Sequence, residues 1–126
     1  MAQRGFTLLE LIVAIAIVAL LLTIALPNYH RHSEKLSVID AKHKLMEIMH
    51  LENRYFSEHA TYTVGITSDL GVASLVSDRG DYQIAATACG AGIHQCVELR
   101  AVAIKGDKPE LIIDSLGNKS PKALWK

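Results

Sequence analysis

The chain carries no excess charge of either sign. Its 126 residues include 13 lysines and arginines against 13 aspartates and glutamates. This balance argues against the strong basic field of a dedicated nucleic-acid-binding domain, and against an acidic tail. A local basic patch is compatible with it. Length allows one ordinary domain of about a hundred residues beside any anchor segment, and no internal repeat or low-complexity run is present.

Motifs of catalysis are also missing. The sequence has no HExxH motif, no glycine-rich phosphate loop and no nucleophile elbow, so neither an enzyme nor a cofactor is predicted. His43, Glu47 and His50 are spaced i, i+4, i+7 and could share one helix face. Such a face could bind zinc, but we favour a solvated polar face and predict no metal. His30 and His32 follow the apolar run and are expected to contact lipid headgroups or a neighbouring helix.

Cysteine is scarce, because the chain has only Cys89 and Cys96. They bracket the short segment GAGIHQ between two predicted strands, where a hairpin would bring them together. An oxidising compartment would favour a disulfide, and two free thiols are the alternative. A metal site is disfavoured, since no second cysteine pair exists and only His94 is near.

Apolar residues, by contrast, form a long run at the N-terminus. From Phe6 to Leu26 the chain has 21 residues with a single charged one, Glu10. As a helix this run measures about 32 Å, enough to cross a bilayer core of about 30 Å. An isolated acid in such a span costs on the order of 3 kcal/mol and is by default a functional residue. The alternative is a carboxylate that reaches the membrane interface.

The residues around the run do not fit an ordinary secretory signal. Such a leader places its small-residue cleavage site after the apolar core. Here Arg4 and Gly5 precede the core, and no clean Ala-x-Ala site lies before Pro27. Cleavage after Gly5 would instead leave the whole apolar helix on the mature chain, with a new amine at Phe6. The charges around the span are too few to predict its orientation.

The segment GFTLLE followed by an unbroken apolar helix resembles the N-terminus of type IV pilins. The resemblance implies cleavage between Gly5 and Phe6 by a prepilin peptidase, with N-methylation of Phe6. It places Glu10 at the family's acidic fifth mature position and Pro27 at its helix-kinking proline. Weaker similarity to PilE-like minor pilins continues through 54–63 and 114–120.

Two features depart from the pattern of that family. Ala19 stands where many pilins have a glycine, so the resemblance gives less support for local melting of the helix during assembly. The chain also ends in KALWK, and therefore lacks the C-terminal disulfide loop of many pilins.

The remaining sequence predicts an α+β fold in which a long N-terminal helix packs on a small antiparallel sheet of three to four strands. After Pro27, which should kink or interrupt the helix, an apolar stripe resumes to about residue 56. Its members are Val38, Ala41, Leu45, Ile48, Leu51 and Tyr55. Strands are predicted at 81–88, 96–104 and 110–114, with a short helix near Leu70–Val76.

The predicted organisation has four parts. They are a leader (1–5), a hydrophobic transmembrane and assembly helix (6–27), an amphipathic helix (28–56), and a linking loop with a β-sheet globular domain (57–126).

The function expected from this resemblance is that of a pilus subunit, more in keeping with a minor pilin than a major one. Its expected partners are other pilin subunits, prepilin peptidase, the inner-membrane assembly platform and, before assembly, membrane lipid. The subunit would move from the inner membrane to an extracellular pilus used for adhesion, motility or DNA uptake, and a nucleic-acid partner is left open. Glu10 would pair with the Phe6 amine, of an adjacent subunit or of its own chain, and this pair would fix the axial register. The alternatives are a type II secretion pseudopilin, although no acidic calcium loop is evident, and a periplasmic binding protein that is anchored but does not polymerise.

Overall fold

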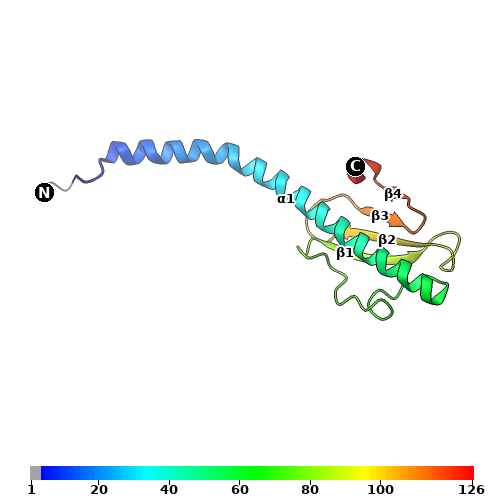
Figure 1. Ribbon diagram of the computed structural model, residues 1–126. Coiled ribbons are helices and arrows are strands. Elements are labelled where there is room, and N and C mark those ends of the chain that lie inside the picture. The colour runs from blue at the N-terminus through cyan, green and yellow to red at the C-terminus, as the bar shows by residue number, and fades with distance from the viewer. Residues whose placement is uncertain (1–3) are drawn as a thin grey trace. The chain divides into compact units, whose positions relative to one another are not determined.

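The computed structural model describes residues 4–126, so residues 1–3 of the predicted leader lie outside the described part. The chain separates into two compact units, one ending at Lys35 and the other spanning Leu36–Lys126. Helix α1, Leu8–His59, contributes residues to both (Figure 1).

The N-terminal unit consists mainly of the first part of α1. Pro27 lies inside α1 and does not interrupt it, although proline cannot donate the usual helical hydrogen bond to the carbonyl four residues earlier. Thr23, which carries that carbonyl, donates its hydroxyl to the Leu20 carbonyl at 2.7 Å. The predicted interruption is therefore wrong, whereas the predicted kink stays a prediction.

The C-terminal unit is a sheet covered on one face by α1. Its strands are β1 (Tyr82–Ala88), β2 (Val97–Ala103), β3 (Leu111–Asp114) and β4 (Lys119–Ser120). They pair antiparallel in sequence order, β1-β2-β3-β4, and the last part of α1 crosses the sheet (Figure 1). Three strands match their predicted positions within a residue at each end. A short 3₁₀ helix, η1 (Lys122–Trp125), follows β4.

The core between α1 and the sheet follows the two expected periodicities. On β2, Val97, Leu99 and Ala101 are buried on alternate positions, as one face of a strand requires. On α1, Ala41, Leu45 and Ile48 of the predicted stripe are completely buried, while its other members are half-buried. The buried face of the helix also includes two polar residues, Ser37 and Glu52.

Helix α1 ends at His59, three residues later than predicted. Ala60 has φ 57° and donates its N–H to the Phe56 carbonyl at 2.8 Å, which is a left-handed helix C-cap. Around this end, Tyr55 stacks on His59 with ring centroids 4.0 Å apart.

The short helix predicted near Leu70–Val76 is wrong. This segment lies along the free edge of β1, where the Leu75 carbonyl accepts the N–H of Ile84 at 2.7 Å and Val76 bridges to Gln83. Its backbone groups form hydrogen bonds with the edge strand β1 rather than with one another, as a helix would require. Gly71 adds a turn with φ 72°. A propensity for helix was thus overridden by a tertiary hydrogen-bonding demand.

Candidate functional site

The start of α1 is organised by Thr7. Its hydroxyl oxygen accepts the N–H of Glu10 at 3.2 Å, immediately before the helix begins at Leu8. Thr7 and Glu10 occupy the two positions of a Thr-x-x-Glu capping box. The first helical turn is also where the helix dipole favours a negative charge. The sequence analysis missed this role of Thr7, although the spacing was readable in TLLE.

Gly5, the predicted cleavage residue, has no structural reason to be glycine. A Cβ built there would meet no atom within 4 Å, and its φ lies outside the left-handed region. Phe6 beside it is 81% exposed. The fold therefore leaves this dipeptide open, which is what a peptidase substrate needs.

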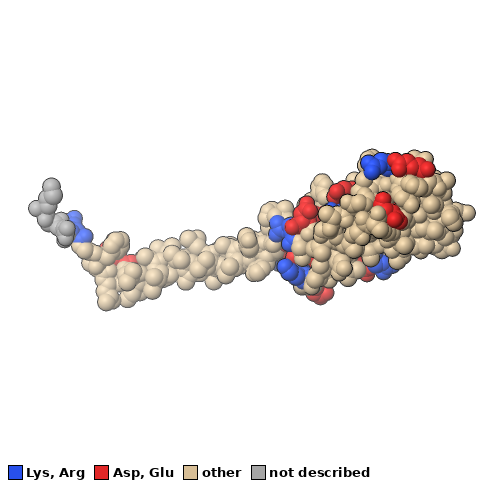
Figure 2. Space-filling view, turned by 90° about the horizontal axis from the view of Figure 1, so that it is seen from below, with Lys and Arg blue, Asp and Glu red and all other residues tan. Residues whose placement is uncertain are grey.

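The apolar part of α1 is not covered by any of the residues that the structure describes. Its large side chains are exposed, from Leu8 at 76% to Leu20 at 68%, and Figure 2 shows an almost uncharged surface along this unit. The most apolar 18-residue stretch of this helix has a mean hydropathy of 2.9, and none of it is buried. By length and composition the helix is able to cross a membrane, and an uncovered apolar surface of this size marks a lipid or protein contact.

Cys89 and Cys96 form a disulfide across the β1–β2 hairpin, with Cα atoms 5.3 Å apart. The Cys89 N–H also bonds to the Cys96 carbonyl at 3.2 Å, so the bond closes a hairpin that the strands already align. Cys96 is completely buried. The predicted pairing is confirmed.

The histidines do not form a metal site in the described residues. His43, Glu47 and His50 are all exposed, as are His30 and His32. Within residues 4–126, potential metal ligands gather in one group, Cys89, Cys96 and Asp114, but its two sulfurs are bonded to each other.

Glu52 is a buried acid that the sequence analysis did not single out. It is completely buried on α1, and one carboxylate oxygen accepts the Thr63 N–H at 3.1 Å. The other oxygen has no hydrogen-bond partner within residues 4–126. Burial raises the pKa of this carboxyl, the Thr63 hydrogen bond lowers it, and the nearby Asp69 raises it further. Glu52 follows Ile48 by four residues and Leu45 by seven, so its helical spacing places it on the buried face, and only its charge argued against burial.

Two protein-family models cover most of the chain. One, described as the prokaryotic N-terminal methylation motif, matches residues 1–26. The other, described as type IV minor pilin ComP, DNA uptake sequence receptor, matches residues 27–110.

Curated relatives point in the same direction. The type IV major pilin protein PilA of Myxococcus xanthus (strain DK1622) is 29% identical over 97 residues, which cover 77% of this chain and 44% of the relative. The type IV major pilin protein PilE of Neisseria gonorrhoeae is 36% identical over 80 residues, covering 64% and 47%. The chain thus spans about half the length of these relatives.

Proposed function

The chain belongs to the family of the type IV minor pilin ComP, and we propose that it is a subunit of a type IV pilus, processed at its N-terminus and then assembled. The family consists of structural pilin subunits, not enzymes. In this proposal the leader, residues 1–5, is removed between Gly5 and Phe6 and the new N-terminus is methylated. Residues 6–27 then hold the subunit in the inner membrane until it enters the filament.

The uncovered apolar half of α1 is the observation that carries this proposal. In the membrane this surface faces lipid tails. In a filament outside the membrane it must face other helices, since apolar area exposed to water costs about 25 cal/mol per Å². Packing of like helices in a bundle meets that demand, with the C-terminal unit, residues 36–126, left on the outside.

The partners follow from the same sequence of events. Prepilin peptidase would act at Gly5 and the inner-membrane assembly platform would extract the anchored subunit. Other pilin subunits, of this or another kind, would receive its helix. The description of the family model, type IV minor pilin, supports a minor subunit.

DNA binding is a second candidate function, favoured by the family model that matches residues 27–110, which is described as a DNA uptake sequence receptor. The match covers most of the C-terminal unit, which would face outward. Residues 36–126 contain 10 lysines and arginines against 11 aspartates and glutamates. DNA binding by this unit would therefore depend on a local basic surface rather than on net charge.

The decisive experiment separates pilus, pseudopilus and monomeric membrane protein. We expect the mature chain in sheared extracellular filaments, at a low ratio to a major pilin. Recovery only with a secretion apparatus would favour the pseudopilin alternative. Recovery only in membranes, with cleavage at Gly5 intact, would contradict assembly.

A further inference from the structure

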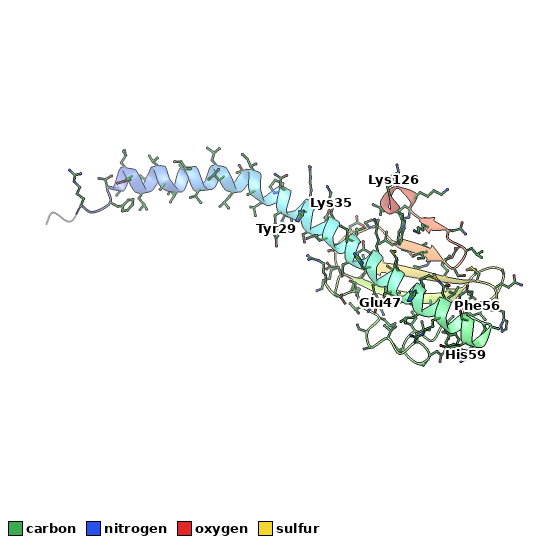
Figure 3. The ribbon with its side chains drawn as sticks, in the orientation of Figure 1. Tyr29, Lys35, Glu47, Phe56, His59 and Lys126 are labelled. Carbon is green, nitrogen blue, oxygen red and sulfur yellow. A yellow bond between two sulfur atoms is a disulfide. The ribbon has the colours of Figure 1, made fainter. Side chains whose placement is uncertain are left out.

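Two lysines, Lys42 and Lys119, contact the single tryptophan of the chain, and two more, Lys122 and Lys126, lie within three residues of it in the sequence. Lys119 belongs to β4, and Lys122 and Trp125 belong to η1. Lys126, labelled in Figure 3, follows η1. Lys42 joins them from α1, far away in the sequence. These five residues are called the C-terminal basic cluster below.

Trp125 holds two of the ammonium groups in place. The Nζ atom of Lys119 lies 5.2 Å from the ring centroid, and that of Lys42 lies 5.6 Å from it, within cation–π range. Lys42 also donates a hydrogen bond to the Leu124 carbonyl, and the indole N–H of Trp125 donates to the Ser120 carbonyl at 3.2 Å. The ring is therefore anchored at its edge, and it concentrates positive charge around itself.

Carboxylates neutralise other cations of this unit but not these. Lys44 pairs with Glu47, Arg79 and Lys108 pair with Asp81, and Arg100 pairs with Glu98 and Glu110, at 2.8–4.0 Å. In the part of the chain that the structure describes, no lysine of the C-terminal basic cluster forms an ion pair. Like charges held together without an acid favour an arriving anion.

We propose that the C-terminal basic cluster binds the phosphate backbone of DNA without reading base sequence. The proposal rests on the DNA-binding function proposed above, and it identifies where a unit with more acids than bases could hold a polyanion. Apart from Lys42, the cluster lies outside residues 27–110, the range matched by the family model. Lysines act on phosphates as point charges, so the cluster would position the duplex, and any base readout would come from other residues.

The residues of the C-terminal basic cluster have different roles. Lys119 and Lys122 are exposed and available to phosphates. Trp125 is a positioning residue, because its ring is shared by two lysines and its N–H is engaged. Since the chain has one tryptophan, its fluorescence reports on the cluster directly.

The test uses the full chain in a non-ionic detergent and follows the anisotropy of a dye-labelled, mixed-sequence DNA duplex at several salt concentrations, so that variants without Trp125 can be measured as well. We expect the duplex to change the Trp125 emission, and Lys119→Gln/Lys122→Gln to weaken binding by about tenfold or more at low salt. Loss of two phosphate contacts should reduce the slope of log K against log salt by about 2. Trp125→Leu should weaken binding with both exposed lysines still present, and Trp125→Phe, which keeps an aromatic face, should restore most of it.

Arg54→Gln/Lys105→Gln is the matched control. It removes the same charge from exposed cations that form no ion pair among the described residues. An equal loss of affinity in the control would overturn the assignment, because net charge alone would explain both. If the cluster variants bind the duplex as tightly as the wild type does, the C-terminal basic cluster is not the binding site, and the proposed DNA function still stands. A wild-type chain that binds anionic lipid vesicles but no duplex would refute both.

Discussion

The Glu52 carboxylate accepts a hydrogen bond from the backbone N–H of Thr63 at 3.1 Å. This bond ties helix α1 to the loop that follows it. The side chain is completely buried, and its second oxygen has no hydrogen-bond partner among the described residues. Thr63 passes the contact on, since its hydroxyl bonds to Asp69 and accepts the Gly65 N–H. A buried charge with half of its oxygens unsatisfied destabilises the fold that contains it.

We therefore expect Glu52→Gln to stabilise the protein at neutral pH, by about 1 kcal/mol. The glutamine oxygen keeps the Thr63 hydrogen bond, and no charge remains buried. Because the pKa of folded Glu52 is raised above its ordinary 4.5, the folded state binds more protons than the unfolded state just above that value. The wild type's free energy of unfolding should then fall as pH rises through this window.

Denaturant unfolding of the full chain in detergent, from pH 4 to pH 8, measures this difference. The advantage of Glu52→Gln should be small at the acid end and grow with pH. Glu47→Gln provides the control, since Glu47 is on the same helix but its side chain is 60% exposed (Figure 3), and it should shift stability by no more than about 0.5 kcal/mol. A gain that is the same at every pH would show that Glu52 is not the titrating group.

Replacement of Gly5 by serine should block leader cleavage and leave the fold intact. The fold tolerates a side chain there, as a Cβ at position 5 meets no atom within 4 Å, so a loss of cleavage reports on the peptidase. Intact-mass measurement of protein from membranes should show a wild-type N-terminus at methylated Phe6 and a variant that retains Arg4. Gly90→Ser is the control, since a Cβ there also meets nothing within 4 Å. An uncut wild-type chain in piliated cells would refute the proposed leader.

Periodicity was enough to predict most of this fold. The alternation of Val97, Leu99 and Ala101 and the helical spacing of Ala41, Leu45 and Ile48 each place apolar groups on one face, so element type and burial follow from geometry. Strand β4 has only two residues, too few to form a pattern. The helix prediction for residues 70–76 failed because this segment hydrogen-bonds to β1, and that pairing is set by the tertiary fold.

The site residues divide in the same way. Gly5, Phe6 and Glu10 are adjacent in the sequence, so a local motif can identify them. Lys42 and Trp125 meet only because the C-terminal turn folds back onto α1, as the hydrogen bond from Lys42 to Leu124 across 82 positions shows. No local pattern contains that contact.

The disulfide should stabilise the C-terminal unit measurably. Closing an eight-residue loop contributes about 2.5 kcal/mol in the chain-entropy account, so Cys89→Ser/Cys96→Ser should lower the free energy of unfolding by about that much. Alkylation of unreduced, denatured protein should add no label, whereas the reduced sample should gain two. Stability unchanged in the double variant would mean that the hydrogen-bonded hairpin alone holds these ends together.

Glu10→Ala should be inserted into the membrane and processed normally, yet fail to enter filaments. Removal of an acid from a lipid-facing helix cannot weaken anchoring. In the filament, however, the Phe6 amine released by cleavage would be buried without a partner, at a cost of about 3–5 kcal/mol for one half of a broken ion pair. Glu10→Gln should be intermediate, because it keeps a hydrogen-bond acceptor without the charge.

The measurement is the ratio of each variant in sheared filaments to the same variant in membranes. Thr7→Ala separates charge pairing from the local helix start, since it removes the hydroxyl that accepts the Glu10 N–H and leaves the carboxylate in place. Loss of that cap costs about 1 kcal/mol, so Thr7→Ala should assemble much better than Glu10→Ala. If Glu10→Ala enters filaments as well as the wild type does, charge pairing is wrong. Glu10 would then be explained by the capping box, by the interface or by contact with the peptidase.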